Sequence, residues 1–238
     1  MRIKNIFPLL FLLLAPIAFC QVQEEDLAML LGGMVKSDKW IIRKDVLEEE
    51  FIGNVHYENE MYKLSADRVL SKRQVKIYEI EGNVILSRKE GETSLTLTAA
   101  RVSYNQKKDT GFAQGSKGKQ VKIVYRIPGN TYTLLANKIE FSKQANFFKA
   151  VGKVKISDKE NTLQAQSATF NRASGIFEAL PQRPLFTGGS KDGDYALTAD
   201  KIVVNTKEQK IKALGQAQGW LASKEEILTE ENLKKIKD

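Results

Sequence analysis

The sequence has very little of what nucleophilic enzymes and disulfide-rich secreted domains use. Its 238 residues include one cysteine, Cys20, and one histidine, His56. So few thiols leave stability to the packing of secondary structure rather than to disulfides. A lone histidine also nearly excludes Ser-His or Cys-His catalysis and histidine-rich metal sites. We interpret His56 as a surface or edge residue, and the sequence predicts no catalytic residue, metal site or cofactor.

Proline is also scarce, with five residues in the chain, and no proline- or serine-rich linker divides it. The nearest candidate is the stretch 181–184, which we interpret as an irregular connection between repeats. A length of 238 residues is enough for one sizeable core. The composition therefore indicates a single long domain with separate terminal segments.

An apolar stretch from Ile6 to Phe19 follows Arg2 and Lys4 and is too short and proline-interrupted to span a bilayer comfortably. It predicts a secretory signal peptide over residues 1–20 and export to an oxidising compartment. Cleavage after Cys20 satisfies the small-x-small rule and would leave no cysteine. Two alternatives stay open: Cys20 as an acylated lipoprotein residue, which the bulky Phe19 disfavours, and an uncleaved inner-membrane anchor.

A Leu-x-Ala signature recurs five times, with 29 to 37 residues between successive copies. Sixteen residues after each alanine stands a glycine, except in the fourth copy, which has Pro181. Such a period is typical of repeat architectures, in which one supersecondary unit stacks on its neighbours to bury its apolar face. The copies begin at Leu64, Leu97, Leu134, Leu163 and Leu197.

Within each copy the apolar residues alternate with a period of two, which predicts short β-strands with one apolar face. An odd step between two apolar pairs, at Asp67-Arg68 in the first copy, predicts a bend or bulge. The sequence thus predicts an all-β, repetitive antiparallel domain over residues 40–221. A helix is expected over residues 21–39, from the spacing of Leu27, Leu30, Leu31, Met34 and Val35. A charged helix or tail is expected over residues 222–238.

The net charge of +8 becomes +6 without the predicted signal peptide, because 35 basic residues then face 29 acidic ones. Lys122, Lys153 and Lys155 alternate with apolar residues, so we expect them on the outer face of strands. They have two interpretations: a solvated face that resists edge aggregation, or attraction to anionic groups such as lipid phosphates. The export signal and the lack of a binding motif argue against nucleic acid.

Carboxylates are the remaining candidates for catalysis, since some β-helix and sandwich enzymes work with Asp and Glu alone. Asp67 and Asp200 occupy the same repeat position, where other copies have Ala, Asn or Gln. A polar bend residue explains that position better than a catalytic role, and Asp194 is the third candidate. We therefore expect no enzymatic activity.

Four segments together carry a family resemblance: Phe51–Val55, Tyr62–Val69, Glu81–Leu86 and Leu197–Ile202. They resemble the OstA-like family of periplasmic lipopolysaccharide-transport proteins over roughly residues 40 to 220. The motif is lost at 115–117 and 181–183. The resemblance implies a twisted, open antiparallel β-jellyroll. It also implies transfer of lipopolysaccharide from an inner-membrane ABC extractor complex to an outer-membrane translocon, either as a soluble bridge or as a membrane-anchored component.

We expect the apolar stripe to hold acyl chains, with Lys and Arg near its rim meeting phosphates, and head-to-tail self-association by strand addition near Val55 and Ile211. The alternatives are a closed core on an envelope scaffold that binds proteins without lipid, and a carboxylate-dependent hydrolase of envelope polysaccharide. The candidate lipid-binding residues are Leu64, Val69, Leu97, Val102, Tyr104, Leu134, Ile139, Phe141, Leu163, Phe170, Leu197, Ile202 and Val204.

Overall fold

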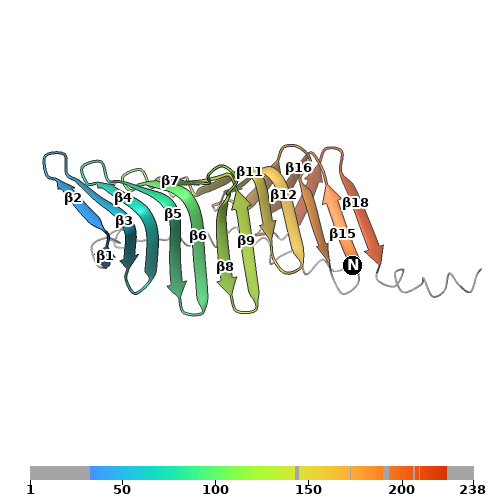
Figure 1. Cartoon of the computed structure of the whole chain (residues 1–238). Helices are drawn as coiled ribbons and strands as arrows, with labels where there is room; N and C mark the ends of the chain where they lie inside the picture. Colours follow the sequence, from blue (N-terminus) through green and yellow to red (C-terminus); the bar gives the residue numbers. More distant parts are fainter. Residues whose placement is uncertain are drawn as a thin grey trace, which may run out of the picture.

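The computed structural model describes residues 33–142, 145–171, 173–189, 193–205, 207–208 and 210–223. These residues form antiparallel strands joined into one sheet. Figure 1 shows the strands following one another along the molecule, from β1 and β2 at one end to β18 at the other. The strands are β1 (Met34–Lys36), β2 (Lys39–Arg43), β3 (Glu48–Glu58), β4 (Tyr62–Lys72), β5 (Ile77–Glu90), β6 (Thr93–Asn105), β7 (Thr110–Gln114), β8 (Val121–Ile127), β9 (Asn130–Ala136), β10 (Lys138–Ser142), β11 (Phe147–Ser157), β12 (Asn161–Asn171), β13 (Ile176–Leu180), β14 (Leu185–Gly189), β15 (Gly193–Thr198), β16 (Lys201–Asn205), β17 (Lys210–Leu214) and β18 (Gln218–Ser223).

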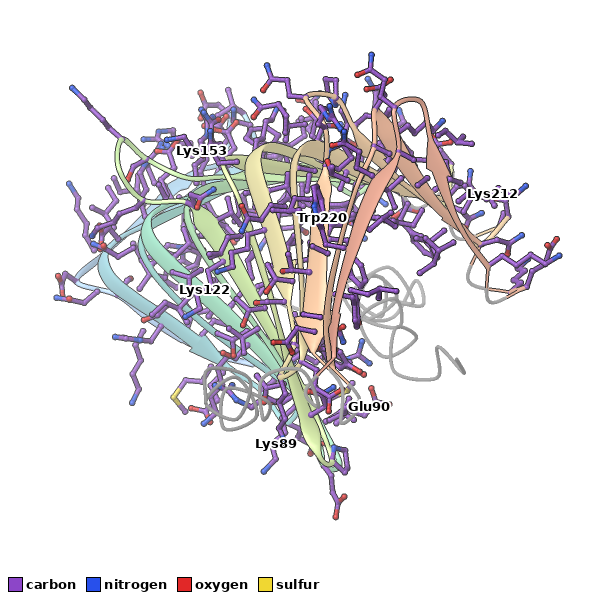
Figure 2. The ribbon with its side chains drawn as sticks, turned by 90° about the vertical axis from the view of Figure 1, so that its right-hand side faces the viewer. Lys89, Glu90, Lys122, Lys153, Lys212 and Trp220 are labelled. Carbon is purple, nitrogen blue, oxygen red and sulfur yellow. The ribbon has the colours of Figure 1, made fainter. Side chains whose placement is uncertain are left out.

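The sheet is folded into two layers because its long strands β3, β4, β5, β6, β11 and β12 bend in the middle and contribute one half to each layer. Layer A runs in the order β2-β3-β4-β5-β6-β7-β10-β11-β12-β13-β16-β17. Layer B runs in the order β1-β3-β4-β5-β6-β8-β9-β11-β12-β14-β15-β18. The layers meet along one corner and diverge from it (Figure 2). The predicted fold class, an all-β open antiparallel jellyroll, is confirmed.

Glycines of the repeat build the corner. Gly82 and Asn83 both have positive φ, at 74° and 48°, and the β4–β5 register shifts there. Opposite them, Oδ2 of Asp67 accepts a hydrogen bond from Nδ2 of Asn83 at 3.0 Å. The bend predicted at Asp67 is therefore confirmed, although β4 and β5 continue through it as single bent strands. Glycine suits this place because the left-handed region costs it no steric strain.

The N-terminal end contains a sixth copy of the repeat that the Leu-x-Ala signature does not reveal. Asn54 donates to Asp38 at 3.0 Å and Gly53 has a φ of 75°, as at the Asp67 corner. The copy begins with Val35-Lys36-Ser37 in place of Leu-x-Ala. The sixteen-residue spacing from Ser37 to Gly53 is the signal that could have found it.

Two expectations at the ends of the domain are corrected by this copy. Met34–Lys36 is strand β1, so the helix predicted up to residue 39 is wrong for that part. Residues 34–36 pair with β3 rather than forming a helix, because Val35 lies opposite Tyr57 and continues the apolar row. The edge expected near Val55 is also wrong, since β3 has strands on both sides. The signal peptide, the rest of that helix and residues 224–238 lie outside the described residues.

Candidate functional site

The space between the two layers is lined by apolar residues from one end of the sheet to the other. In layer B one continuous cross-strand row carries the leucine of five repeat copies and Val35 of the N-terminal copy, with apolar residues of intervening strands between them. The row consists of Val35, Tyr57, Leu64, Leu86, Leu97, Ile123, Leu134, Ile156, Leu163, Phe186 and Leu197.

Layer A contributes two rows of inward-facing residues opposite the layer B row. The row next to the corner contains Val69, Val102, Ile139 and Ile202, joined mainly through alanines. The row nearer the open side is largely aromatic. Its members from β5 to β17 are Tyr78, Tyr104, Gly111, Phe141, Phe148, Phe170, Phe177, Val204 and Ile211.

All thirteen candidate residues thus lie on the inner faces of the two layers. Ten are buried, for example Leu134 at 2% exposure and Phe170 at 0%, and they belong to one connected core. Tyr104, Phe141 and Leu197 are half-buried. The stripe therefore packs against itself, and each buried large side chain contributes about 1.5–3 kcal/mol.

A half-buried aromatic pair lies in the row nearer the open side. The rings of Tyr104 and Phe141 stack with their centroids 5.9 Å apart and their planes at 18°. Gly111 separates them in the row, and a Cβ atom there would lie 2.4 Å from the Phe141 ring. The absence of a side chain at Gly111 thus lets the two rings meet.

The open side of layer B has a tyrosine belt that sequence reasoning missed. Two residues before the repeat leucine stand Tyr62, Tyr132 and Tyr195, with Leu95 and Asn161 in the other copies. The Tyr195 hydroxyl donates to Oδ1 of Asn161. Burial raises the pKa of Tyr132, and that of Tyr195 to about 12, so both stay neutral at physiological pH. The constant offset from the leucine was the signal available in the sequence.

Arg88 is a cation on this inner face, next to Tyr62 in the cross-strand register. Its guanidinium carbon lies 5.6 Å from the centre of the Tyr62 ring, and Nη2 lies 2.9 Å from Oε2 of Glu90. The side chain is 13% exposed. A tyrosine ring and a carboxylate thus stabilise a charge beside apolar surroundings.

The outer face of layer A carries alternating acids and bases near the N-terminal end. Oε2 of Glu50 accepts from Nη2 of Arg43 at 2.6 Å, and Oε1 accepts from Nε of Arg68 at 2.7 Å. These two guanidinium groups hold the pKa of the buried Glu50 carboxyl below its usual value. Arg68 also forms an ion pair with Glu81 at 3.0 Å, and Glu81 forms a further ion pair with Arg101 at 3.2 Å. This face is neutralised by its own ion pairs.

The carboxylates considered for catalysis are not brought together. Asp67 and Asp200 lie at corners of different copies, beside Gly82 and Gly215, and Asp194 lies in β15. His56 is exposed on the outer face of layer B, with Nδ1 2.9 Å from the Ser65 hydroxyl oxygen. Within the described ranges, His, Cys, Asp and Glu form no group of three suited to a metal ion. No helix in that same part of the chain has the length and apolar character needed to cross a membrane.

Comparison with known proteins finds likenesses among solved structures. No family profile matches the chain, and no curated protein matches it. Among solved structures, the chain is similar to the crystal structure of LptH from Pseudomonas aeruginosa, described as the LptA homologous periplasmic component of the conserved lipopolysaccharide transport device. The match covers 80% of this chain and 94% of that chain, at 12% identity and a TM-score of 0.27. Because so low a score describes little common superposition, we draw no conclusion about this chain from it.

Proposed function

We propose that this protein is a periplasmic carrier that holds the acyl chains of lipopolysaccharide between its two layers and passes the lipid from the inner to the outer membrane. The observation that carries the proposal is the continuity of the apolar rows, which run without a break from β1 to β15 in layer B and from β5 to β17 in layer A. The sequence motifs shared with the OstA-like family support the same function.

The size of the hydrophobic effect favours such a long interior. Shielding acyl carbons from water contributes about 0.8 kcal/mol per CH2, so one chain of about a dozen carbons represents on the order of 10 kcal/mol of gross transfer free energy. A lipid with several chains needs a long apolar surface rather than a small cavity. Rows that run along the whole sheet provide that surface.

The connection between the layers offers a route of entry. The bent strands join the two layers along the corner, whereas hairpin turns end each layer on the open side. Widening on the open side therefore breaks side-chain packing but few backbone hydrogen bonds. We infer that acyl chains enter past Tyr104 and Phe141, which are half-buried.

The ends of the sheet support a bridge of several molecules. β17 and β18 end the sheet on one side, β1 and β2 on the other, and the described residues place no further strand beyond them. Unpaired strand edges are ready sites for strand addition. The expected partners are a second copy of this chain, the inner-membrane extractor complex and the outer-membrane translocon.

In vivo photocrosslinking tests the lipid-binding part directly. A photoreactive amino acid at Leu134, Phe141 or Phe170 is compared with the outward-facing neighbours Thr133, Glu140 and Thr169 on the same strands. Lipopolysaccharide adducts at the inner positions alone would support the carrier, with Phe141 giving the strongest signal. Folded variants without inner adducts would overturn it and favour an envelope scaffold that binds proteins. Equal adducts on both faces would also overturn it.

A further inference from the structure

The outer faces of the two layers differ in charge. On the outer face of layer A many of the cations pair with carboxylates, including Lys138 with Glu140 and Lys201 with Glu178, both at 2.6 Å. From β5 to β14, the outward positions of layer B hold only serine, threonine, glutamine, glycine, aliphatic residues and cations among the described residues. The cations are Lys89, Lys122, Arg126 and Lys155.

These layer B cations are exposed, and no ion pair joins them to a carboxylate within the described part of the chain. Lys122 and Lys155 flank the same residue, because both pair with Leu135 of the strand between them. Their charges therefore lie about 10 Å apart, two strand spacings, on one sheet face. They are not neutralised in the way the layer A charges are.

The corner extends the same charge. The segment 115–120 forms a small turn with a bridge between Ser116 and Lys119. Nε2 of Gln120 donates to the carbonyl oxygen of Lys153 at 2.9 Å, which ties this turn to the corner of β11. Figure 2 shows Lys122 and Lys153 on the side of the molecule away from the opening between the layers. We call the following residues the basic face: Lys89, Lys117, Lys119, Lys122, Arg126, Lys153 and Lys155.

We propose that the basic face docks on the surface of an anionic phospholipid bilayer. All but one of its cations are lysines, and a lysine carries a compact charge on a flexible side chain. A protein partner with carboxylates in fixed positions would instead favour arginine, which makes bidentate hydrogen bonds. Several exposed positive charges spread over an extended face suit the mobile phosphate groups of a lipid surface. This inference goes beyond the proposed function, because it concerns the outside of the molecule and holds whether or not the interior takes lipid.

Vesicle binding gives the first test. The full chain is titrated with vesicles of phosphatidylcholine alone and with vesicles that contain phosphatidylglycerol as well. We expect binding only to the anionic vesicles, weakening as salt rises. Removing three lysines, in K122Q/K153Q/K155Q, should weaken binding on the order of 100-fold, at roughly five-fold for each lysine. Glutamine is tolerated at the left-handed corner position, since Gln182 and Gln216 occupy such positions naturally.

The matched control removes the same charge elsewhere. K76Q/K107Q/K108Q changes three exposed lysines at hairpin turns of layer A, and Lys76, like Lys153, has a positive φ. We expect this control to bind anionic vesicles as the parent chain does. Equal binding by the two triple variants would overturn the proposal, as would a parent chain that does not distinguish the two kinds of vesicle.

A second measurement is independent of how strongly other segments attach the chain to the vesicle. A photocrosslinker at Leu135, within the basic face, is compared with one at Thr169, on the outer face of layer A. Phospholipid adducts at Leu135 and not at Thr169 would support docking by this face. Adducts at neither position, at both equally, or to a protein at Leu135 in cells would overturn it. Lipopolysaccharide adducts at inner positions report separately on the carrier function.

Discussion

The amide N–H of Asn137 donates a hydrogen bond to the carbonyl oxygen of Gly152 at 2.9 Å, and its side chain fills the space that a Cβ atom at residue 152 would need. That Cβ atom would lie 2.4 Å from Nδ2 of Asn137. Gly152 has a φ of 80° and belongs to the corner that joins the layers through β11. The repeat glycine is therefore required for two reasons, its backbone conformation and the closeness of the opposite strand.

Replacing Gly152 by alanine should separate these two reasons. Gly129 is a matched control, since its φ is 81° and a Cβ atom there would have no other atom within 4 Å. We expect Gly129→Ala to lower the free energy of unfolding by about 1–2 kcal/mol, from backbone strain alone. Gly152→Ala should cost about 2–4 kcal/mol, because Asn137 must also move. Urea unfolding measures both, and equal losses would contradict the close approach.

The repeat explains why much of the fold could be predicted. Strict alternation fixes which side chains share a face, so the leucines of the copies fall into one row of layer B. The bend at Asp67 was predictable because the alternation slips there by one residue. The glycine or proline sixteen residues later marked the opposite side of the same corner.

Other features depend on contacts that no local pattern reports. Val35 fits a helical spacing with Leu27 and Leu31, but pairing with Tyr57 makes it part of a strand. The tyrosine belt is visible only when the copies are aligned two residues before their leucine. The sequence also left open whether the stripe is a groove or a core, and the 0% exposure of Phe170 shows that the stripe is packed there.

Acidification should remove the stabilisation that Glu50 provides. Its pKa is lowered in the folded protein, so this stability is present above the ordinary glutamate value of 4.5 and is lost as the pH falls through the lowered value. At neutral pH, Glu50→Gln should cost about 1.5–3 kcal/mol, since two charge-assisted hydrogen bonds are weakened. The difference from the parent should shrink steadily below pH 4.5. Glu92→Gln, at an exposed turn position, is the control, and a Glu50→Gln penalty independent of pH would contradict this account.

At alkaline pH, the raised pKa of Tyr195 should lower the free energy of unfolding. Its pKa is raised from 10.0 to about 12 in the folded protein, mainly by burial. Between these values the unfolded chain loses the Tyr195 proton while the folded chain keeps it, so the free energy of unfolding falls as the pH rises. Tyr195→Phe removes this group and should show a shallower fall between pH 10 and pH 12. Parallel profiles for the parent and the variant, measured by denaturant unfolding, would contradict the prediction.

Self-association through the two ends of the sheet is testable with complementary variants. Leu221 is 72% exposed in the terminal strand β18 and extends the inner row that contains Tyr195. At the other end, Trp40 is 58% exposed and stacks on Phe51 with the ring centroids 5.5 Å apart. Leu221→Asp or Trp40→Asp would place a carboxylate in a contact that buries apolar surface. Either change should weaken association at least about ten-fold in sedimentation velocity.

Mixing the two variants decides whether the contact is head-to-tail. Each variant keeps one intact end, so an equimolar mixture of Leu221→Asp and Trp40→Asp should form a dimer and no longer species. An isologous contact between like ends would instead leave one productive end in each variant, so each would dimerise alone. Val75→Asp is the control, since Val75 is 46% exposed in the turn between β4 and β5, neither of which is an edge strand. If both end variants associate as strongly as the parent chain, the sheet edges are not the contact.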